Sequence, residues 1–361
     1  MRRAVIGMGF GDEGKGCTTS WLSSLDSRAT VVRYSGGPQA GHHVMHKSKE
    51  HIFASFGSGT LAGRPTFTSA DCVVDPIEVM REYDILVGKG VEPKLTVSGY
   101  CPIITPMDVM ANQCDSEVRE HGTCGFGINS TLRREDDHHH ILARDLLYPE
   151  VLKAKLQALE AHYYDLSEPF DPTDFLGACD ELIRVVSISD SELLLNVLYE
   201  GSQGLMLDKD IGIFPNVTPY NVGMKGIGTS VDEAYYVTRA YNTRHGNGTM
   251  LAPPRTDYLE IKDNPWEYNH TNQFQGRFRK GMLNVDTLEY ALHCDDGYLV
   301  DTSILVVTCL EHVDRLVYYS QGRVEECATR EAFCNDIAKI LGLEKYVMCV
   351  AHKFGRITGV T

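Results

Sequence analysis

The sequence has no surplus of basic residues. Its 361 residues include 34 Lys and Arg against 49 Asp and Glu, which gives a formal net charge of −15. Sequence-independent attraction to a nucleic acid backbone or to an anionic membrane depends on such a surplus. The charge balance therefore argues against a general nucleic-acid-binding protein and against a protein that binds anionic membranes, although local basic clusters can still bind small anions.

Long apolar runs are also missing. No stretch approaches the ~20 apolar residues of a membrane-spanning helix, and the apolar run behind the two N-terminal arginines is too short for a signal peptide. The 11 cysteines include no C-x-x-C pair, which is typical of reduced thiols in a cytosol rather than of a disulfide framework or a zinc site. We therefore expect a soluble cytoplasmic protein, in the host cytoplasm if the protein is viral.

Internal repeats, low-complexity tracts and linker-like segments are absent as well. With 43% hydrophobic residues, the chain can bury a sizeable core. Its strand-length apolar runs and its segments of helical periodicity together predict an α/β fold with a mostly parallel central sheet and flanking helices. We expect residues 1–361 to form a single domain with loop and helical insertions.

The expected elements follow from periodicity and from turn residues. Strands are predicted at residues 4–6, 31–34, 94–97, 193–199 and 304–308. Helices are predicted after residue 16 and at 75–82, 149–162 and 174–184, and residues 329–341 show an amphipathic pattern. Residues 231–242 are predicted as helix followed by strand, and residues 200–204 and 245–280 as loops.

The first glycine-rich turn is the main functional signal. Residues 9–15 match the phosphate-loop pattern G-x-x-x-x-G-K between a predicted strand and a predicted helix. In that setting, backbone N–H groups and a helix N-terminus can bind a phosphate. Gly16 stands where Ser or Thr usually holds magnesium, and Asp12 inside the loop could supply the missing ligand.

Two other interpretations of this turn remain open. Gly9, Gly11 and Gly14 also satisfy the G-x-G-x-x-G dinucleotide pattern of dehydrogenases. That site needs an acidic residue after the second strand, but the run at residues 29–32 ends in Arg33 and Tyr34. A purely structural glycine turn is the second alternative. Phosphate binding is the preferred hypothesis.

Six motifs then resemble those of adenylosuccinate synthetases, in the same order along the chain. They are Gly11-Asp12-Glu13-Gly14-Lys15-Gly16, Gly36-Gly37-x-x-Ala40-Gly41-His42, Gly122-Thr123-x-Gly125, Glu200-Gly201-x-Gln203-Gly204, Pro215-x-Val217-Thr218 and Gly276-Arg277-x-Arg279. The resemblance extends from residue 4 to about residue 315. It implies a fold like that of the phosphate-loop NTPases.

The resemblance also implies a reaction. Enzymes of this family join L-aspartate to C6 of a 6-oxopurine nucleotide, using a nucleoside triphosphate and Mg²⁺. The C6 oxygen is a poor leaving group, so it is first phosphorylated and then displaced by the amine. This chemistry needs a base at N1 and a proton donor at the γ-phosphate.

Matching positions imply the roles of individual residues. Asp12 matches the base and metal ligand, His42 the acid, Lys15 a phosphate ligand, and Gly41 a carbonyl ligand of magnesium. The positions implied to bind nucleotide are Gly11, Glu13, Gly14, Gly16, Gln39, Ser58, Thr123, Cys124, Arg133, Gln203, Thr218, Cys309 and Glu311. Those implied to bind aspartate are Gln275, Arg277 and Arg279, whose guanidinium groups suit carboxylates. The family is dimeric, and Arg133 or Arg134 is the candidate for an arginine shared across the interface.

Some positions depart from the cellular members of the family. The guanine-reading motif Thr-Lys-Leu-Asp is replaced by Thr308-Cys309-Leu310-Glu311, and Gln39, Cys124 and Phe126 replace Asn, Thr and a basic residue. These changes and the short chain are similar to the phage-type 2-aminoadenylosuccinate synthetases. The sequence-based hypothesis is therefore a ligase acting on dGMP with ATP or dATP, for 2-aminoadenine DNA synthesis. The alternative is a synthetase acting on IMP with GTP in AMP biosynthesis.

Two further alternatives concern other classes of protein. A regulatory phosphate-loop switch would bind nucleotide without catalysis, but it would not need Arg277 and Arg279. The run Asp136-Asp137-His138-His139-His140 could be a metal site. Because adjacent side chains point in different directions, we interpret this run as a polar loop.

Overall fold

The structure is a computed structural model. It describes residues 1–115, 125–163, 171–190, 196–251, 259–262, 276–295 and 299–361. The chain forms two compact units, the first made of Met1–Trp21 and Leu198–Thr361 and the second of Leu22–Val197. Within the described residues, no helix combines the length and apolarity needed to cross a membrane.

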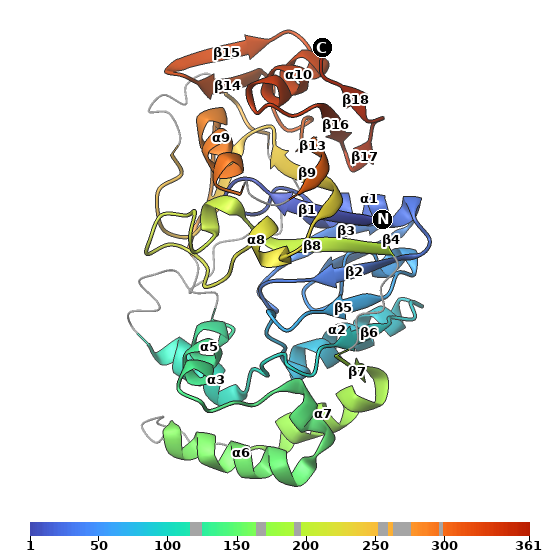
Figure 1. Ribbon diagram of the computed structural model, residues 1–361, viewed down its shortest axis with the longest axis vertical. Coiled ribbons are helices and arrows are strands. Elements are labelled where there is room, and N and C mark those ends of the chain that lie inside the picture. Colours follow the sequence, from blue (N-terminus) through green and yellow to red (C-terminus); the bar gives the residue numbers. More distant parts are fainter. Residues whose placement is uncertain (116–124, 164–170, 191–195, 252–258, 263–275, 296–298) are drawn as a thin grey trace. The chain divides into compact units, whose positions relative to one another are not determined.

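The first unit contains a mostly parallel sheet with the strand order β17-β16-β13-β9-β1-β8, and β18 also pairs with β16 (Figure 1). These strands are β1 (Arg2–Gly7), β8 (Asn196–Gly204), β9 (Val231–Arg239), β13 (Val300–Thr308), β16 (Lys345–Val350), β17 (Lys353–Phe354) and β18 (Thr358–Gly359). β9 is parallel to both β1 and β13, and β13 is parallel to β16. Only β17 and β18 run antiparallel to β16.

Smaller elements complete the first unit. The helices are α1 (Lys15–Leu25), α8 (Met224–Ile227), α9 (Val285–Cys294), α10 (Arg330–Ile340) and the 3-10 turn η3 (Leu205–Leu207). The additional strands are β10 (Asn242–His245), β11 (Phe278–Gly281), β12 (Leu283–Asn284), β14 (Leu316–Ser320) and β15 (Arg323–Cys327). β10 and β11 form an antiparallel pair. α1 and β8 carry the chain from one unit to the other.

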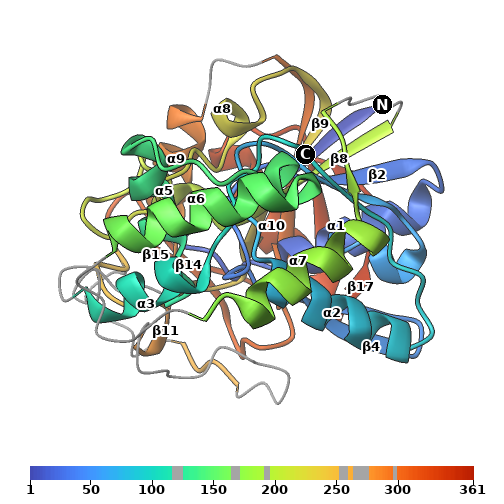
Figure 2. The ribbon, with the colours of Figure 1, turned by 90° about the horizontal axis from the view of Figure 1, so that it is seen from below.

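The second unit contains four parallel strands in the order β2-β5-β6-β7. These are β2 (Ala29–Arg33), β5 (Thr66–Thr68), β6 (Leu95–Val97) and β7 (Ser187–Ile188), and a hairpin is formed by β3 (His42–His46) and β4 (Lys49–Phe53). The helices are η1 (Thr60–Ala62), α2 (Pro76–Gly88), α3 (Pro106–Cys114), α5 (Ile128–Asp136), η2 (Ala143–Leu147), α6 (Pro149–His162) and α7 (Thr173–Val185). α2 and α7 lie side by side in this unit (Figure 2).

Local signals predicted several of these elements. α6 coincides with the predicted helix 149–162, and its Leu152, Leu156 and Leu159 are buried as the periodicity requires. α2 begins after Asp75, whose side chain accepts hydrogen bonds from two backbone N–H groups of the first turn. The predicted α/β class with mostly parallel strands is confirmed.

The expected helix within residues 231–242 is wrong. β9 is a strand from Val231 to Arg239, and it lies between β1 and β13. A parallel strand buried on both faces has no alternation of apolar and polar residues, so its pattern resembles a buried helix.

Two predicted loops also contain strands. Residues 200–204 continue β8 rather than following it, because the strand ends at Gly204. Residues 245–280 include the end of β10 and most of β11, while their largest part lies outside the described residues. The predicted strand 193–199 is described only from Asn196 onward.

Candidate functional site

The phosphate loop follows β1 in the first unit and leads into α1. Gly11, Asp12 and Gly14 have φ angles of 88°, 59° and 95°. This left-handed backbone costs glycine nothing, and aspartate tolerates it better than most residues. The loop therefore turns sharply enough to present backbone N–H groups at the start of α1.

The carboxylate of Glu13 lies inside this turn. Its Oε1 accepts hydrogen bonds from the backbone N–H groups of Gly9 and Gly11 at 2.8 and 2.9 Å, and Lys15 Nζ donates to its Oε2 at 2.9 Å. The two charged side chains are only 4% and 2% exposed. The groups expected to bind phosphate are thus gathered around a carboxylate of the loop itself, an arrangement suited to an anion.

Side chains from three other strands, β9, β10 and β13, hold the carbonyl groups of this loop. Thr308 Oγ1 donates to Glu13 O at 2.7 Å, Thr243 Oγ1 donates to Gly11 O at 3.3 Å, and Arg239 Nε donates to Asp12 O. The sequence analysis missed these supporting roles of Arg239 and Thr243. The available signal was their position at or after the end of an apolar run.

Gln203 and Thr218, both expected at the acceptor nucleotide, belong to the same unit. The amide oxygen of Gln203 is buried and has no hydrogen-bond partner within the described part of the chain. The Thr218 N–H donates to Leu207 O at 2.7 Å, which ties the 215–218 segment to the turn that follows β8. A buried amide oxygen without a partner fits a position that contacts a ligand.

Arg244, which the sequence analysis also missed, lies opposite Arg279 in the β10–β11 pair. Its guanidinium group is almost fully buried and donates to the carbonyl oxygens of Asn247, Thr249 and Asn216 at 2.8, 2.6 and 3.0 Å. Burial, with a further contribution from the charge of Arg279, lowers the pKa of Arg244 to about 10.

The two guanidinium groups carry positive charge without a matching carboxylate. Within the residues that the structure describes, neither Arg244 nor Arg279 forms an ion pair, and Arg279 Nε is buried without a hydrogen-bond partner. Burial lowers the pKa of Arg279. Arg277, two residues earlier, is exposed. A buried cation such as Arg244 is stabilised by a bound anion, and planar guanidinium groups suit carboxylates.

The 308–311 motif forms a tight turn after β13. Cys309 has a φ of 57°, and its carbonyl oxygen accepts the His312 N–H at 3.1 Å. The turn brings Glu311 Oε1 to 3.4 Å from His312 Nε2. Glu311 Oε2 is buried and has no hydrogen-bond partner within the described residues, so this oxygen is available to a ligand.

The second unit holds the other predicted residues. His42 begins β3 and is buried, and its Nδ1 lies 3.5 Å from Ser58 Oγ. The structure therefore brings His42 and Ser58 together. Gln39 Oε1 is buried without a hydrogen-bond partner among the described residues, and Gly41 is exposed. The roles of these residues remain predictions.

Thr123, Cys124 and Gln275 lie outside the described residues.

Gly14 is packed against Thr308, with only 3.0 Å between the position of an added Cβ and Thr308 Cγ2. Gly16 is buried in the first turn of α1. Gly14 therefore allows the loop to lie close to the end of β13.

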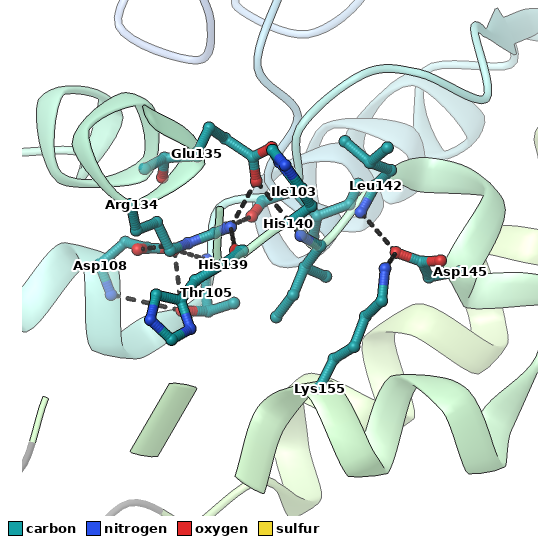
Figure 3. A network of polar contacts seen from close by, with 12 residues as sticks. Ile103, Thr105, Asp108, Arg134, Glu135, His139, His140, Leu142, Asp145 and Lys155 are labelled. Carbon is teal, nitrogen blue, oxygen red and sulfur yellow. Dashed lines mark hydrogen bonds and ion pairs between the residues drawn. The ribbon is translucent and has the colours of Figure 1, made fainter. Parts of the chain in front are cut away.

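The two adjacent arginines of α5 have different environments, and Arg134 lies in a network of polar contacts with Asp108 and Glu135 (Figure 3). Arg134 is fully buried; its Nε donates to Asp108 at 2.8 Å, and its other nitrogens reach Glu135 and backbone carbonyl groups. Arg133 is 56% exposed and pairs with Asp115 at 2.8 Å. Only Arg133 is therefore accessible enough to reach a second subunit.

A magnesium site made only of protein ligands is not found. Among the described residues, no group of three or more His, Cys, Asp or Glu side chains could hold a metal ion. Mg²⁺ usually takes one or two carboxylates and completes its shell with phosphate oxygens and waters. The half-buried carboxylate of Asp12 within the phosphate loop fits that arrangement. Within the part of the chain that the structure describes, residues 136–140 belong to no such group, and α5 extends to Asp136.

Comparisons with known proteins agree with the motifs. The profile of the family described as adenylosuccinate synthetase matches residues 4–326. An adenylosuccinate synthetase from Picrophilus torridus is 31% identical over 338 residues, covering 88% of this chain and 78% of the relative. A second, from Thermodesulfovibrio yellowstonii, is 29% identical over 383 residues, covering 97% and 80%.

Solved structures share the fold. A fully ligated adenylosuccinate synthetase from Plasmodium falciparum superposes with a TM-score of 0.77 at 19% identity, covering 97% of each chain. The succinoaminodeoxyadenylate synthetase of cyanophage S-2L, bound to dGMP and to dATP as an energy donor, has a TM-score of 0.59 at 14% identity, covering 96% and 91%. The chain therefore belongs to the adenylosuccinate synthetase family and is a carbon–nitrogen ligase of the adenylosuccinate synthetase type.

Proposed function

We propose that this chain joins the amino group of L-aspartate to C6 of IMP, with GTP as the phosphate donor and Mg²⁺ as the metal ion. The single observation that supports this best is the pair of guanidinium groups of Arg244, which is buried, and Arg279, which is half-buried, without a carboxylate partner in the described chain. Beside a phosphate loop, such a pair suits a substrate that brings its own carboxylates. IMP and GTP are preferred because the curated relatives are adenylosuccinate synthetases.

The proposed reaction has two steps. In the first, the C6 oxygen bonds to the γ-phosphorus and the nucleoside diphosphate leaves, while Asp12 accepts the N1 proton and His42 donates a hydrogen bond to the transferred phosphate. In the second, the aspartate nitrogen bonds to C6 and gives up a proton as inorganic phosphate leaves with the oxygen. Lys15 holds phosphate oxygens as a point charge. Asp12 would hold Mg²⁺, and the ion would offset the negative charge of the phosphates.

A second candidate uses dGMP with ATP or dATP. Cys309 and Glu311 support it, because they replace the Lys and Asp of the family's guanine-reading motif. The phage synthetase bound to dGMP and dATP shares the fold, although at a lower TM-score than the Plasmodium enzyme. The dGMP reaction is thus less well supported than the IMP reaction.

One matrix of assays separates these candidates. Purified protein is incubated with aspartate and Mg²⁺, crossing IMP, GMP and dGMP with GTP, ATP and dATP, and the products are identified by mass. We expect an aspartate adduct of IMP with GTP. Product formed only from dGMP with an adenine triphosphate would replace this proposal with the second candidate, and GTP binding without any adduct would indicate a regulatory switch.

The aspartate site has its own test. Replacing Arg279 by methionine should raise the KM for aspartate about ten- to hundredfold, because a charge-assisted contact is lost. The affinity for GTP should not change. Arg323→Gln, on the exposed strand β15, is the matched control. An unchanged KM for aspartate in Arg279→Met would contradict the assignment.

We also propose that the enzyme is a cytoplasmic homodimer in which Arg133 reaches the nucleotide of its partner. The exposed position of Arg133 supports this role, whereas Arg134 is fully buried. Mixing the inactive variants Arg133→Met and Asp12→Asn should restore part of the activity if subunits exchange, and sedimentation should show a dimer. No restored activity in a verified mixed dimer would contradict the shared arginine.

A further inference from the structure

A chain of polar contacts connects the turn at Glu311 with the phosphate loop, entirely within the first unit. Arg239 Nε donates to the carbonyl oxygen of Asp12, and Arg239 Nη1 donates to Tyr241 Oη at 2.9 Å. Tyr241 Oη lies 3.1 Å from His312 Nδ1, and His312 Nε2 lies 3.4 Å from Glu311 Oε1. Glu311, which is proposed to contact the nucleobase of the triphosphate, and the backbone of Asp12, which is proposed to accept the N1 proton, are therefore the two ends of one network.

The chemistry of arginine sets the direction of this network. A guanidinium group can only donate, so Tyr241 Oη accepts from Arg239 and directs its own hydrogen toward His312. His312 Nδ1 is then an acceptor, which leaves the ring proton on Nε2. That proton faces the carboxylate of Glu311. The opposite tautomer would place a nitrogen lone pair against the carboxylate.

The surroundings keep the middle of the network rigid. Tyr241 is buried, with 1% of its surface exposed, and the guanidinium carbon of Arg239 lies 5.5 Å from the centre of the Tyr241 ring and 5.6 Å from that of Phe278. Stacking of this kind limits the rotation of a guanidinium group. A displacement of His312 is therefore transmitted to Arg239 rather than absorbed by free side-chain motion.

The two carboxylate oxygens of Glu311 are not equivalent. Oε1 faces His312, whereas Oε2 is buried and has no hydrogen-bond partner within the described residues. A buried oxygen in this state is stabilised when a ligand supplies an N–H group. His312 therefore orients the carboxylate so that the second oxygen points to the ligand.

We propose that His312 is a positioning residue that sets the donor-base specificity of Glu311 and couples the bound base to the loop that carries Asp12. This inference rests on the proposed function, since it takes Glu311 as the residue that contacts the base of the triphosphate. The ligand is a purine nucleoside triphosphate that presents N–H donors at its Watson–Crick edge. Guanine offers two such donors side by side, and adenine offers only its amino group.

The main test compares three variants of the full-length protein. His312→Phe removes both ring nitrogens, His312→Gln keeps one donor and one acceptor, and His293→Gln alters an exposed histidine at the end of α9 as the matched control. Calorimetry measures the Kd for GTP, ATP and IMP. We expect His312→Phe to weaken GTP binding about ten- to hundredfold and to reduce the preference for GTP over ATP, with IMP binding unchanged. His312→Gln should recover most of the loss.

The coupling to Asp12 is tested by removing the hydroxyl group at the centre of the network. Tyr241→Phe removes the link between Arg239 and His312 without touching Glu311. We expect it to lower kcat more than it changes the KM for GTP, and a Tyr241→Phe/His312→Phe double variant to lose less kcat than the product of the two single effects predicts. If the loss of kcat in the double variant equals the product of the two single losses, the proposed coupling is wrong.

The binding and kinetic results also separate this inference from the proposed function. If His312→Phe binds GTP as tightly as the wild type does, the role of His312 is wrong, whatever reaction the enzyme catalyses. If GTP binding weakens as expected but no aspartate adduct forms in the wild type, the proposed ligase reaction fails and the positioning role stands. Should His312→Phe not fold, the same GTP and ATP affinities measured in His312→Ala, which also lacks both ring nitrogens, decide the question.

Discussion

At the scale of single residues, the interior of the phosphate loop is the most demanding environment in the first unit. Glu13 and Lys15 are buried together, and two backbone N–H groups of the loop are satisfied by the same carboxylate. A buried ion pair contributes little compared with a well-packed apolar pair, but losing one member leaves an uncompensated charge. The loop thus depends on both residues at once.

This dependence predicts a strong coupling between the two side chains. Glu13→Gln and Lys15→Met should each lower the free energy of unfolding by about 3 kcal/mol, because each leaves a buried charge or its partners unsatisfied. The double variant should be clearly more stable than the sum of the single losses predicts. Urea unfolding of the four proteins measures this coupling, and additive losses would contradict it.

Asp75 predicts a pH dependence in the second unit. Burial, opposed by hydrogen bonds from the Glu78 and Ile77 N–H groups, raises the pKa of this carboxyl from 3.8 to about 6. The folded state therefore binds the proton more tightly than the unfolded chain. Asp75 consequently lowers stability as the pH rises from about 4 to about 6, by at most about 3 kcal/mol.

Asp75→Asn tests this sign, because asparagine also caps a helix. The variant should be more stable than the wild type at pH 7.5 and equally stable near pH 4. Urea midpoints across that range provide the measurement. A difference between the two proteins that does not change with pH would show that Asp75 is not the titrating group.

At the scale of elements, the site depends on how closely β8 approaches the phosphate loop. A Cβ added to Gly204 would lie 2.2 Å from the carbonyl oxygen of Gly9 and 2.5 Å from Glu13 Oε1. Real Cβ atoms essentially never approach backbone oxygens so closely. The glycine at the end of β8 therefore allows the strand and the loop to pack together.

Gly204→Ala should displace the loop and abolish binding of nucleoside triphosphate. Gly359→Ala, at a position with no atom within 4 Å of the added Cβ, is the control and should leave binding unchanged. Calorimetric titration with GTP and Mg²⁺ measures both variants. Tight binding by Gly204→Ala would contradict the close packing of β8 and the loop.

The contact between α3 and α5 predicts a contrast between neighbouring arginines. Arg134→Met should lower the free energy of unfolding by about 3–5 kcal/mol, because Asp108 would remain buried without its partner. Arg133→Met removes an exposed pair with Asp115 and should cost less than about 1 kcal/mol. Urea unfolding of both variants measures this contrast, and equal losses would contradict it.

At the scale of the whole molecule, the chain consists of two units with their own cores. Val5, Val237 and Leu305 are fully buried in the first, and Leu152 and Phe175 are buried in the second. A ligand that binds only the folded chain stabilises it by mass action, by about 2.7 kcal/mol at a hundred times its Kd. Thermal unfolding can therefore report on nucleotide binding without any turnover.

GTP with Mg²⁺ should raise the unfolding temperature of the wild-type protein measurably. The increase should be much smaller in Lys15→Met, because the cation that holds the phosphate oxygens is missing. Calorimetry of both proteins with and without nucleotide gives the comparison. Equal increases in both proteins would show that Lys15 does not contact the triphosphate.

Sequence alone determined the strand, the glycine turn and the helix that begin the first unit, and also α2, α6 and α7. Each is specified by local features such as glycine spacing, the Asp75 cap and the leucines of α6. The ordered motifs also indicated the family. Phosphate binding is a prediction from the glycine spacing, and aspartate binding by Arg277 and Arg279 is a prediction from the family resemblance.

Only the tertiary structure decided how these residues are supported. Arg239 and Asp12 are separated by 227 positions, and Arg244 is recognisable only when β10 and β11 pair. The pattern of residues 231–242 predicts helix followed by strand, but β9 is a strand from Val231 to Arg239, because burial on both faces removes the alternation that marks a strand. Local pattern specifies an element through its neighbours in the chain, whereas a buried polar network depends on contacts that form only after the strands have assembled.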